Sequence, residues 1–269
     1  MSKILFAFAV IISINQNMYS QELITDTSNY EVIYDLKYQR DSTDTDSQHE
    51  KMSLLIGDDY SLFESVNNQY NDSLLIALAE NKENMSMKML GSKMISQKKS
   101  SHFGFKILKN AKETLVQNSF NSNDFNYKDK DELDWKIMGK NQVINSYKCT
   151  LAKTRFAGRN YKAWFTNEIP ISDGPYKFKG LPGLIIKIED AQGHYVFELE
   201  SFQKKKSSFE FDPQKGTEVS KKEYLESHNA YKKNFVSELR NSGIKVKGSQ
   251  RRIQKKAQRL RNNEIEISF

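Results

Sequence analysis

The chain has 269 residues, of which 38% are hydrophobic and 28% charged, with only 12 Gly, 4 Pro and 1 Cys. This composition excludes disordered, collagen-like and disulfide-stabilised proteins and is typical of a globular protein. The formal net charge of +7 is unevenly distributed, because nine Lys and Arg and no acidic residue lie between Arg240 and Arg261. The basic character therefore belongs to a segment near the C-terminus.

Residues 1–20 predict a secretory signal peptide. Lys3 supplies a positive charge, Ile4–Ile14 form an apolar run too short to span a bilayer, and Ser20 is a small residue at the predicted cleavage site. Met18, three positions before the cleavage point, departs from the preferred small residue, so an uncleaved anchor stays an alternative. We therefore expect a periplasmic or secreted protein that lacks a further transmembrane segment.

The predicted organisation is one β-rich domain over residues 21–240, followed by a basic segment over residues 241–269. The single Cys149 lies far from the leader, which excludes a lipoprotein anchored through an N-terminal cysteine. Because Cys149 has no internal partner, it is either a small buried residue or a free thiol, and burial is the usual state of such a cysteine.

The first half of the predicted domain combines strands with one helix. Alternating polarity predicts a strand over Tyr30–Gln39, and a hairpin is predicted from Met52–Ile56 and Tyr60–Glu64. A helix capped near Asn71–Ser73 is expected to lie against the sheet through Leu74, Leu75 and Leu78. Two further short strands are predicted over 103–108 and 114–120, and residues 121–134 read as a surface loop rich in Asn, Asp and Lys.

Two hairpins follow in the second half. In the first, Tyr147–Phe156 and Tyr161–Thr166 are joined by a turn centred on Gly158 and Arg159, which pairs Phe156 with Tyr161. One face of this hairpin is apolar, and the other carries Trp164 with the basic residues Lys153, Arg155 and Lys162. In the second hairpin, pairing Ile188 with Tyr195 gathers six apolar residues on one core face: Leu184, Ile186, Ile188, Tyr195, Phe197 and Leu199.

A C-terminal helix is predicted over 220–240. Ser220 and Glu223 form a capping box, and an aromatic stripe runs through Tyr224, His228, Tyr231, Phe235 and Leu239. The overall expectation is an α+β fold, mainly antiparallel β, with a curved sheet or half-barrel, flanking helices and one C-terminal helical segment.

Prolines and glycines concentrate between residues 170 and 183, which predicts a built bend of the backbone. Its last part, Gly180, Leu181, Pro182, Gly183, Leu184 and Ile185, resembles the name-giving motif of the GLPGLI family of exported proteins from Bacteroidetes-type bacteria. The resemblance extends from Trp135 to Asp190. It departs at Asn145-Ser146, where the family often has glycine. The resemblance implies an exported location and the fold. It implies no activity, because none is established for that family.

The sequence contains no recognisable catalytic or cofactor motif. Ser or Cys nucleophile motifs, paired zinc ligands and phosphate loops are all missing, and the four histidines are scattered. His194 is expected to form an ion pair with Glu189 at a hairpin mouth. We therefore expect no cofactor and no metal, and an enzyme with an unfamiliar site near residues 170–183 stays as the alternative.

The predicted binding surface combines cations with aromatic rings: Trp164, Lys153, Arg155, Arg159, Lys162, Tyr176 and Phe178. Such a surface suits an anionic or lipid-like ligand, whereas the competing interpretation places Trp164 in the core. The sequence thus predicts an exported, non-enzymatic envelope protein that binds a lipid, peptide or protein partner. A purely structural envelope role remains open. The basic C-terminal segment is either a solvated helix or a contact for an anionic surface, and nucleic acid is not expected.

Overall fold

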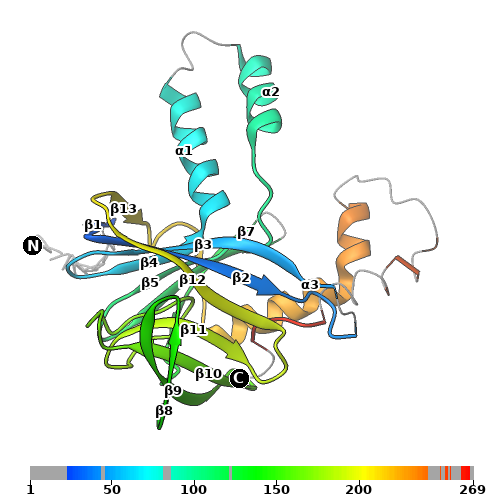
Figure 1. Cartoon of the computed structure of the whole chain (residues 1–269). Coiled ribbons are helices and arrows are strands. Elements are labelled where there is room, and N and C mark those ends of the chain that lie inside the picture. The colour runs from blue at the N-terminus through cyan, green and yellow to red at the C-terminus, as the bar shows by residue number, and fades with distance from the viewer. Residues whose placement is uncertain are drawn as a thin grey trace, which may run out of the picture.

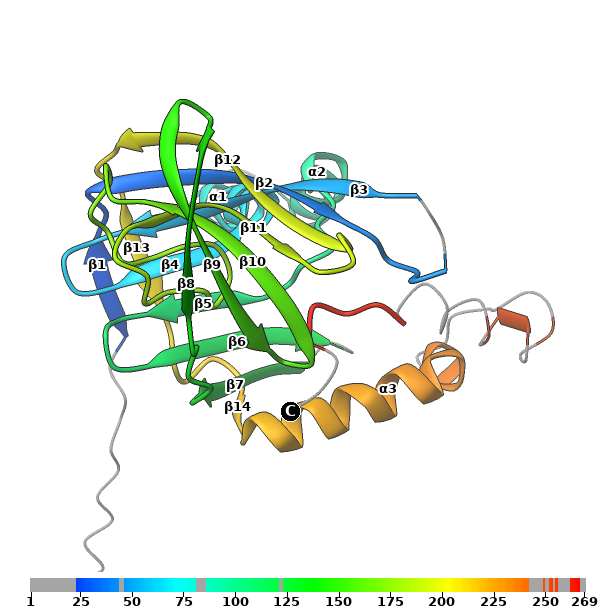
Figure 2. The same cartoon turned by 60° about the horizontal axis from the view of Figure 1, so that its bottom comes forward.

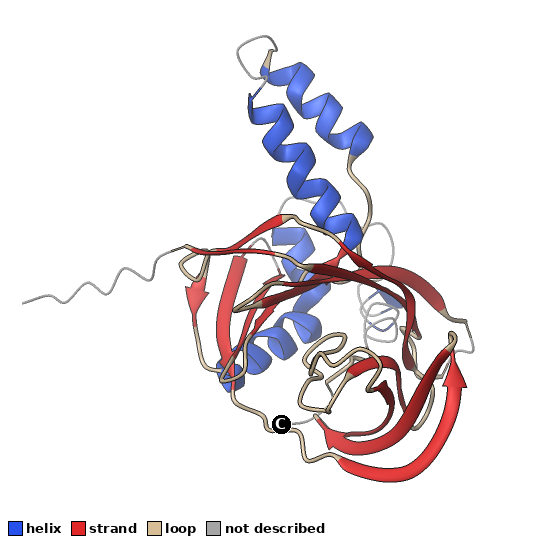
Figure 3. Cartoon of the chain, turned by 60° about the vertical axis from the view of Figure 1, so that its left-hand side comes forward, coloured by secondary structure: helices blue, strands red, loops and turns tan. Residues whose placement is uncertain are grey.

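The computed structural model describes residues 23–43, 46–80, 86–120, 123–241 and 262–266, together with a few isolated residues between 249 and 255. The predicted signal peptide and most of the basic segment therefore lie outside the described residues. Within them, most strands join one large, strongly curved sheet that does not close on itself (Figures 1 and 3). Helices flank this sheet, and α3 follows the last strand in sequence. The predicted fold class is confirmed.

The large sheet contains, in spatial order, β14 (Thr217–Glu218), β7 (Asn123–Asp129), β6 (Thr114–Phe120), β5 (Lys106–Lys109), β4 (Ser61–Ser65), β3 (Gln48–Ile56), β2 (Tyr30–Tyr38), β12 (Tyr195–Lys204), β11 (Leu184–Asp190), β10 (Arg159–Thr166), β9 (Tyr147–Phe156) and β8 (Lys136–Ile144). Among the strands that the structure describes, only β14 and β7 pair in parallel. A separate ribbon of β1 (Ile24–Thr27) and β13 (Ser208–Phe211) covers a small apolar cluster that includes Leu62.

The main core fills the concave side of the sheet. Val32, Tyr34 and Leu36 alternate along β2 and are fully buried, as the period of the sequence predicts. The Tyr34 hydroxyl crosses this interior and donates a 2.8 Å hydrogen bond to the carbonyl oxygen of Ile185 on β11. This hydrogen bond links β2 to β11 across the interior of the sheet.

Both predicted hairpins form, with partners displaced by two residues. Phe156 pairs with Arg159, because Ala157 and Gly158 form the turn with φ of 45° and 84°. Positive φ at both central positions defines a type I′ turn, so the predicted centre at Gly158 and Arg159 is wrong. Ile188 likewise pairs with Phe197. A shift of two preserves the faces, and the six predicted apolar residues of the second hairpin are all buried.

The turn between β8 and β9 also contains positive φ values, 48° at Asn145 and 69° at Ser146. This backbone conformation accounts for the glycine that the resembled family often places at this point. Asn145 adopts it here and donates a 2.6 Å hydrogen bond from its side chain to the carbonyl oxygen of Leu199.

The segment 170–183 is packed inside the curved sheet. Phe178 is fully buried, and Leu181 is 1% exposed. Lys109 of β5 reaches the segment with its ammonium group 2.5 Å from the Asp173 carboxylate. The Trp135 indole donates to the carbonyl oxygen of Lys179 at 2.9 Å. The proline-rich and glycine-rich bend is thus part of the core.

Two expectations for the first half of the domain are wrong. Residues 121–134 are not only a loop, because β7 pairs with β6 along its full length and buries Tyr127 and Asp129 on the concave side. The predicted helix begins earlier, as α1 (Val66–Glu80), and is followed by α2 (Met87–Gln97). The two helices form a hairpin that projects away from the sheet, so the predicted leucines do not cover it (Figure 1).

Helix α3 (Lys221–Asn241) packs beside β6 and β7 (Figure 2). The capping box is present, because the backbone N–H of Ser220 donates to Glu223 at 2.8 Å and that of Glu223 donates to the Ser220 hydroxyl at 3.2 Å. Phe120 of β6 contacts the rings of Tyr224, His228 and Tyr231. In the described chain, no helix combines the length and apolarity needed to cross a bilayer.

Candidate functional site

The seven predicted binding residues lie on two different sides of the sheet. Lys153, Lys162 and Trp164 line an outer groove of about 790 Å³ over β8–β12. Arg155 lines a neighbouring groove of about 490 Å³, together with Lys153 and Lys162. Trp164 itself is 9% exposed, so its ring is mostly covered. The three basic residues therefore lie on the predicted outer face, whereas Trp164 belongs to the buried core, as the competing interpretation expects, and a ligand for this face remains a prediction.

Arg159, Tyr176 and Phe178 lie on the concave side and are buried. Arg159 occupies the first position of β10, because the turn is centred one residue earlier than the sequence suggests. Its guanidinium donates 2.8 Å and 2.7 Å hydrogen bonds to the side chains of Asp190 and Asn263. The prediction that these three residues share a surface with Trp164 is therefore wrong.

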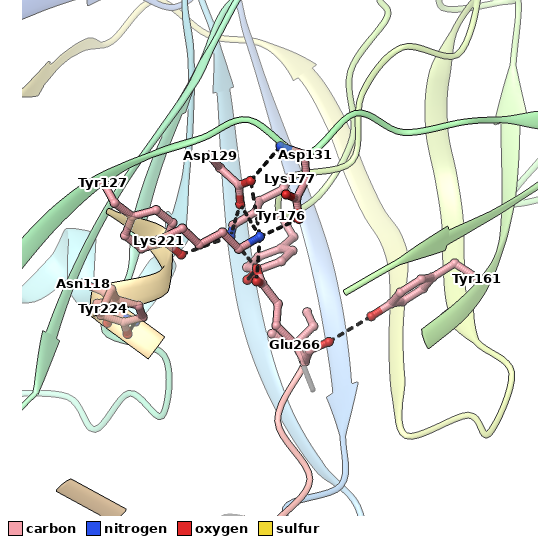
Figure 4. A network of polar contacts seen from close by, with 11 residues as sticks. Asn118, Tyr127, Asp129, Asp131, Tyr161, Tyr176, Lys177, Lys221, Tyr224 and Glu266 are labelled. Atoms are coloured by element: carbon pink, nitrogen blue, oxygen red, sulfur yellow. Dashed lines mark hydrogen bonds and ion pairs between the residues drawn. The ribbon is translucent and has the colours of Figure 1, made fainter. Parts of the chain in front are cut away.

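A buried charged cluster lies beside the inner segment 170–183 (Figure 4). The Lys177 ammonium is 2.5 Å from the Asp129 carboxylate and also contacts Glu266. Lys221 of α3 lies 3.0 Å from Asp129 and 3.1 Å from Glu266, and it reaches Asp131 at 2.6 Å. The cluster thus joins β7, the inner segment, α3 and the end of the described chain.

The two carboxylates at the centre of this cluster remain ionised at neutral pH. Burial raises the pKa of Asp129 and of Glu266, but the ammonium groups of Lys177 and Lys221 outweigh it, so both pKa values lie below their ordinary range. For Lys177, burial lowers the pKa, but the attraction of Glu266 and Asp129 outweighs burial and the pKa is raised. The ion pairs of this cluster connect segments that lie far apart in the sequence.

Residues 262–266 form the segment that this cluster holds, and we call it the tail (Figure 2). The Tyr195 hydroxyl donates to the carbonyl oxygen of Asn263 at 2.6 Å, and Arg159 donates to that of Glu264. The Tyr161 hydroxyl donates to the carbonyl oxygen of Ile265 at 3.2 Å. The tail is therefore held by hydrogen bonds to its backbone carbonyl oxygens as well as by the ion pairs of Glu266.

A cavity of about 460 Å³ lies between the tail, α3, β6 and the connection before β5, and we call it the ring-lined cavity. Its walls carry eight Phe and Tyr rings and two imidazoles: Phe103, Phe105, Phe120, Tyr127, Tyr176, Tyr195, Tyr224, Tyr231, His102 and His228. A volume of this size is typical of sites for small ligands. Aromatic walls suit the flat or apolar part of such a ligand.

Polar groups are present at several points of the ring-lined cavity. Arg40 lines it, and the buried Nε atom of Arg40 has no hydrogen-bond partner. Asn118 donates a 2.7 Å hydrogen bond to the Tyr224 hydroxyl. The Glu266 carboxylate links the cavity to the charged cluster. The cavity thus combines apolar walls with the guanidinium-bearing residue Arg40 and the Glu266 carboxylate.

The two residues that would favour the enzyme alternative, Cys149 and His194, lie outside the ring-lined cavity. Cys149 is buried, as predicted, and burial raises the pKa of its thiol to about 11. His194 does not pair with Glu189; its Nδ1 lies 3.4 Å from the Arg159 guanidinium. Neither residue lines the ring-lined cavity. Among the described residues, no group of three or more His, Cys, Asp or Glu side chains is placed to hold a metal ion.

Most residues of the ring-lined cavity were missed by the sequence analysis. They come from separate segments before β5, on β6, β7 and α3, and in the tail. A signal existed on α3, where the stripe of Tyr224, His228 and Tyr231 marks the face that lines the cavity. For Phe103 and Phe105, nothing in the local pattern distinguishes a cavity wall from an ordinary core position.

Comparison with known proteins gives a partial family match. A family model described as a protein of unknown function (Porph_ging) matches residues 156–187, which contain β10, the inner segment and the Gly180–Ile185 motif. It is a family of unknown function, as the motif predicts, although the GLPGLI name itself is not the one matched. No curated protein matches the chain.

Among solved structures, PNGF-II is similar in two crystal forms. The structure in space group C2 is 18% identical with a TM-score of 0.49, and it covers 75% of this chain and 32% of PNGF-II. The structure in space group P21 is 19% identical with a TM-score of 0.47, covering 75% and 33%. The chain therefore spans about a third of the length of PNGF-II.

Proposed function

We propose that the protein is an exported, non-enzymatic binding protein whose ring-lined cavity holds a small amphipathic ligand. One observation carries the proposal: a cavity of about 460 Å³ is lined by ring side chains from several segments together with the cationic residue Arg40. A mostly apolar pocket with a few polar groups at its edge is the usual form of a small-molecule site. Export is supported by the sequence of residues 1–20.

The chemistry of the walls defines the ligand class. Stacked and edge-on rings around Phe120 favour an aromatic or acyl body, which would displace water from apolar surface. The guanidinium of Arg40 favours an anionic end, because a carboxylate or phosphate accepts charge-assisted hydrogen bonds. A fatty acid and a short peptide with an aromatic side chain both have this chemistry, and native mass analysis of the ligand separates them.

The enzyme alternative has less support. Asp173 and Lys177 on the inner segment are each bonded to an oppositely charged partner, and the Lys179 ammonium group donates to the carbonyl oxygens of Asn110 and Glu113. A general acid or base needs a proton within reach of a substrate, and these groups are committed to structural contacts instead. Lys177 belongs to the cluster that anchors the tail, and Asp173 pairs with Lys109 of β5.

A fluorescent ring-bearing anion, 8-anilinonaphthalene-1-sulfonate, tests the proposal. We expect one probe molecule per chain and weaker binding by about tenfold in Arg40→Gln, which removes a charged donor. Gly104 lines the cavity, and a Cβ atom there meets only Asn118 and Ser119 at ordinary contact distances, so we expect Gly104→Phe to place its ring in the cavity. This variant should abolish binding.

Val143→Phe is the matched control, since Val143 is 64% exposed on the remote strand β8. Circular dichroism should show that all variants keep the β-rich fold. Equal probe binding by the Gly104→Phe variant and the unaltered protein would show that the ring-lined cavity is not the binding site.

A further inference from the structure

The α1–α2 hairpin exposes an unusual amount of apolar surface. It carries six of the ten exposed large hydrophobic side chains in the described chain: Tyr70, Leu75, Ile76, Met87, Met89 and Ile95. Met87 and Ile95 are each 83% exposed. The hairpin projects from the sheet as a separate arm, and no element of the described chain covers it (Figures 1 and 3). Exposed apolar surface of this kind marks a site of interaction.

The base of the arm is fixed, and its far end is not packed against the domain. Asn71, the one buried residue of α1, donates to the carbonyl oxygen of Lys99 at 2.9 Å and accepts from the N–H of Lys99 at 2.8 Å. Helix α2 has no buried residue. The polar latch at the base therefore holds the arm in place without using the apolar side chains further out.

The apolar side chains near the tip point in several directions. Leu75 and Ile76 are consecutive, so they lie about 100° apart around α1, and Met87 and Met89 lie about 200° apart around α2. A partner protein with a one-sided groove would need a single stripe instead. An acyl region would surround such side chains from every direction, and Leu75 lies about 7.5 Å from the end of α1.

The positive charges of the described arm lie on and directly after α2. Residues 86–99 contain Lys88, Lys93, Lys98 and Lys99 and no acidic residue, whereas α1 carries Asp72 and Glu80 and no basic residue. The Asp72 carboxylate of α1 is already occupied by Lys106 at 2.6 Å. Lysine stems can lie along apolar surface while their ammonium groups reach lipid headgroups.

We propose that the tip of the α1–α2 hairpin inserts into the headgroup region of a membrane that contains anionic lipids. Leu75, Ile76, Met87 and Met89 enter the acyl boundary, and the lysines of α2 contact the headgroup phosphates. This attachment is independent of the ring-lined cavity, and it places the cavity of the domain near a membrane surface.

Co-sedimentation with lipid vesicles tests this proposal, with protein recovered as the cell processes it and without detergent. We expect binding to vesicles of phosphatidylcholine mixed with phosphatidylglycerol. Binding should weaken by at least about tenfold when Leu75, Ile76, Met87 and Met89 are all replaced by Ser. Lys88→Glu with Lys93→Glu should weaken it by about fivefold or more per residue, with little effect on pure phosphatidylcholine vesicles.

The control carries Ile137→Ser and Val143→Ser, which remove similarly exposed apolar side chains from β8. It should bind vesicles like the unaltered protein, and every variant shares the same N-terminus and basic C-terminal segment. Vesicle binding that is unchanged in the hairpin variants would overturn the proposal and point to those other segments. A dimer in solution that the Ser variant converts to a monomer would also overturn it, because the arm would then cover a second copy.

Discussion

The Arg159 guanidinium donates a 2.8 Å hydrogen bond to the Asp190 carboxylate, and both side chains are buried. This pair connects the start of β10 to the end of β11. The same guanidinium binds the backbone and a side chain of the tail. A single residue therefore joins the hairpin that begins the matched family segment to the far end of the chain.

Replacing Arg159 by Ala should lower the free energy of unfolding by about 3–5 kcal/mol, because the Asp190 carboxylate is left buried without its partner. Urea denaturation measures this change. Arg155→Ala is the control on the exposed face of the neighbouring strand, and its effect should stay within about 0.5 kcal/mol. Similar losses for the two variants would mean that the buried pair has no special role.

The glycine that precedes β11 is required by close backbone contact. A Cβ atom at Gly183 would lie 2.0 Å from the carbonyl oxygen of Thr166, so Gly183→Ala should destabilise the protein by about 2–4 kcal/mol. Gly91 in α2 has open space around it, and Gly91→Ala should stabilise the protein by about 0.5–1 kcal/mol. Thermal denaturation compares the two variants, and a neutral Gly183→Ala variant would contradict the close contact.

Glu64 makes stability depend on pH. Burial raises the pKa of Glu64 to about 7, despite the attraction of Lys106. Because the folded pKa lies above the unfolded one, this group stabilises the fold at low pH, and the stabilisation is lost as the pH rises to about 7. The loss should reach about 3 kcal/mol. Urea denaturation at pH 5 and pH 8 should show a flatter profile for Glu64→Gln, and parallel profiles would disprove the raised pKa.

The Cys149 thiol should be inert in the folded protein. With its pKa raised to about 11 by burial, the thiolate fraction at pH 8 is lower than that of a free cysteine by about a hundredfold. Titration with a thiol-reactive disulfide reagent should therefore be slow in buffer and fast in urea. Rapid reaction of the folded protein would indicate an accessible thiol.

The strand pattern of the fold was largely predictable, because apolar and polar residues alternate along a strand that has one buried face. Along β2 the apolar residues alternate with mainly polar ones. In the hairpins each side chain lies on the predicted face of the sheet although the predicted register is wrong by two residues. The register itself depends on backbone angles, and an Ala with positive φ, Ala157, is not a usual turn residue. Strand β7 was missed because the buried positions Asn126 and Asp129 are polar and bond to other polar groups.

The site was less predictable, because its residues meet only through tertiary structure. Arg40 and Phe120 are 80 positions apart, and each alone looks like an ordinary strand-end residue. The predicted outer surface rested on one hairpin, where sequence proximity and spatial proximity coincide. Lys177 looked like a loop cation, but its partner Asp129 lies 48 positions earlier in the chain and was assigned to a loop.

Native mass spectrometry of protein recovered without detergent, before and after organic extraction, tests the central claim about the ring-lined cavity. The account predicts one bound amphipathic anion per chain, lost on extraction and absent from the Gly104→Phe variant. Val143→Phe should retain it. An unliganded mass for the unaltered protein, with no uptake of added fatty acids or aromatic peptides, would contradict the account.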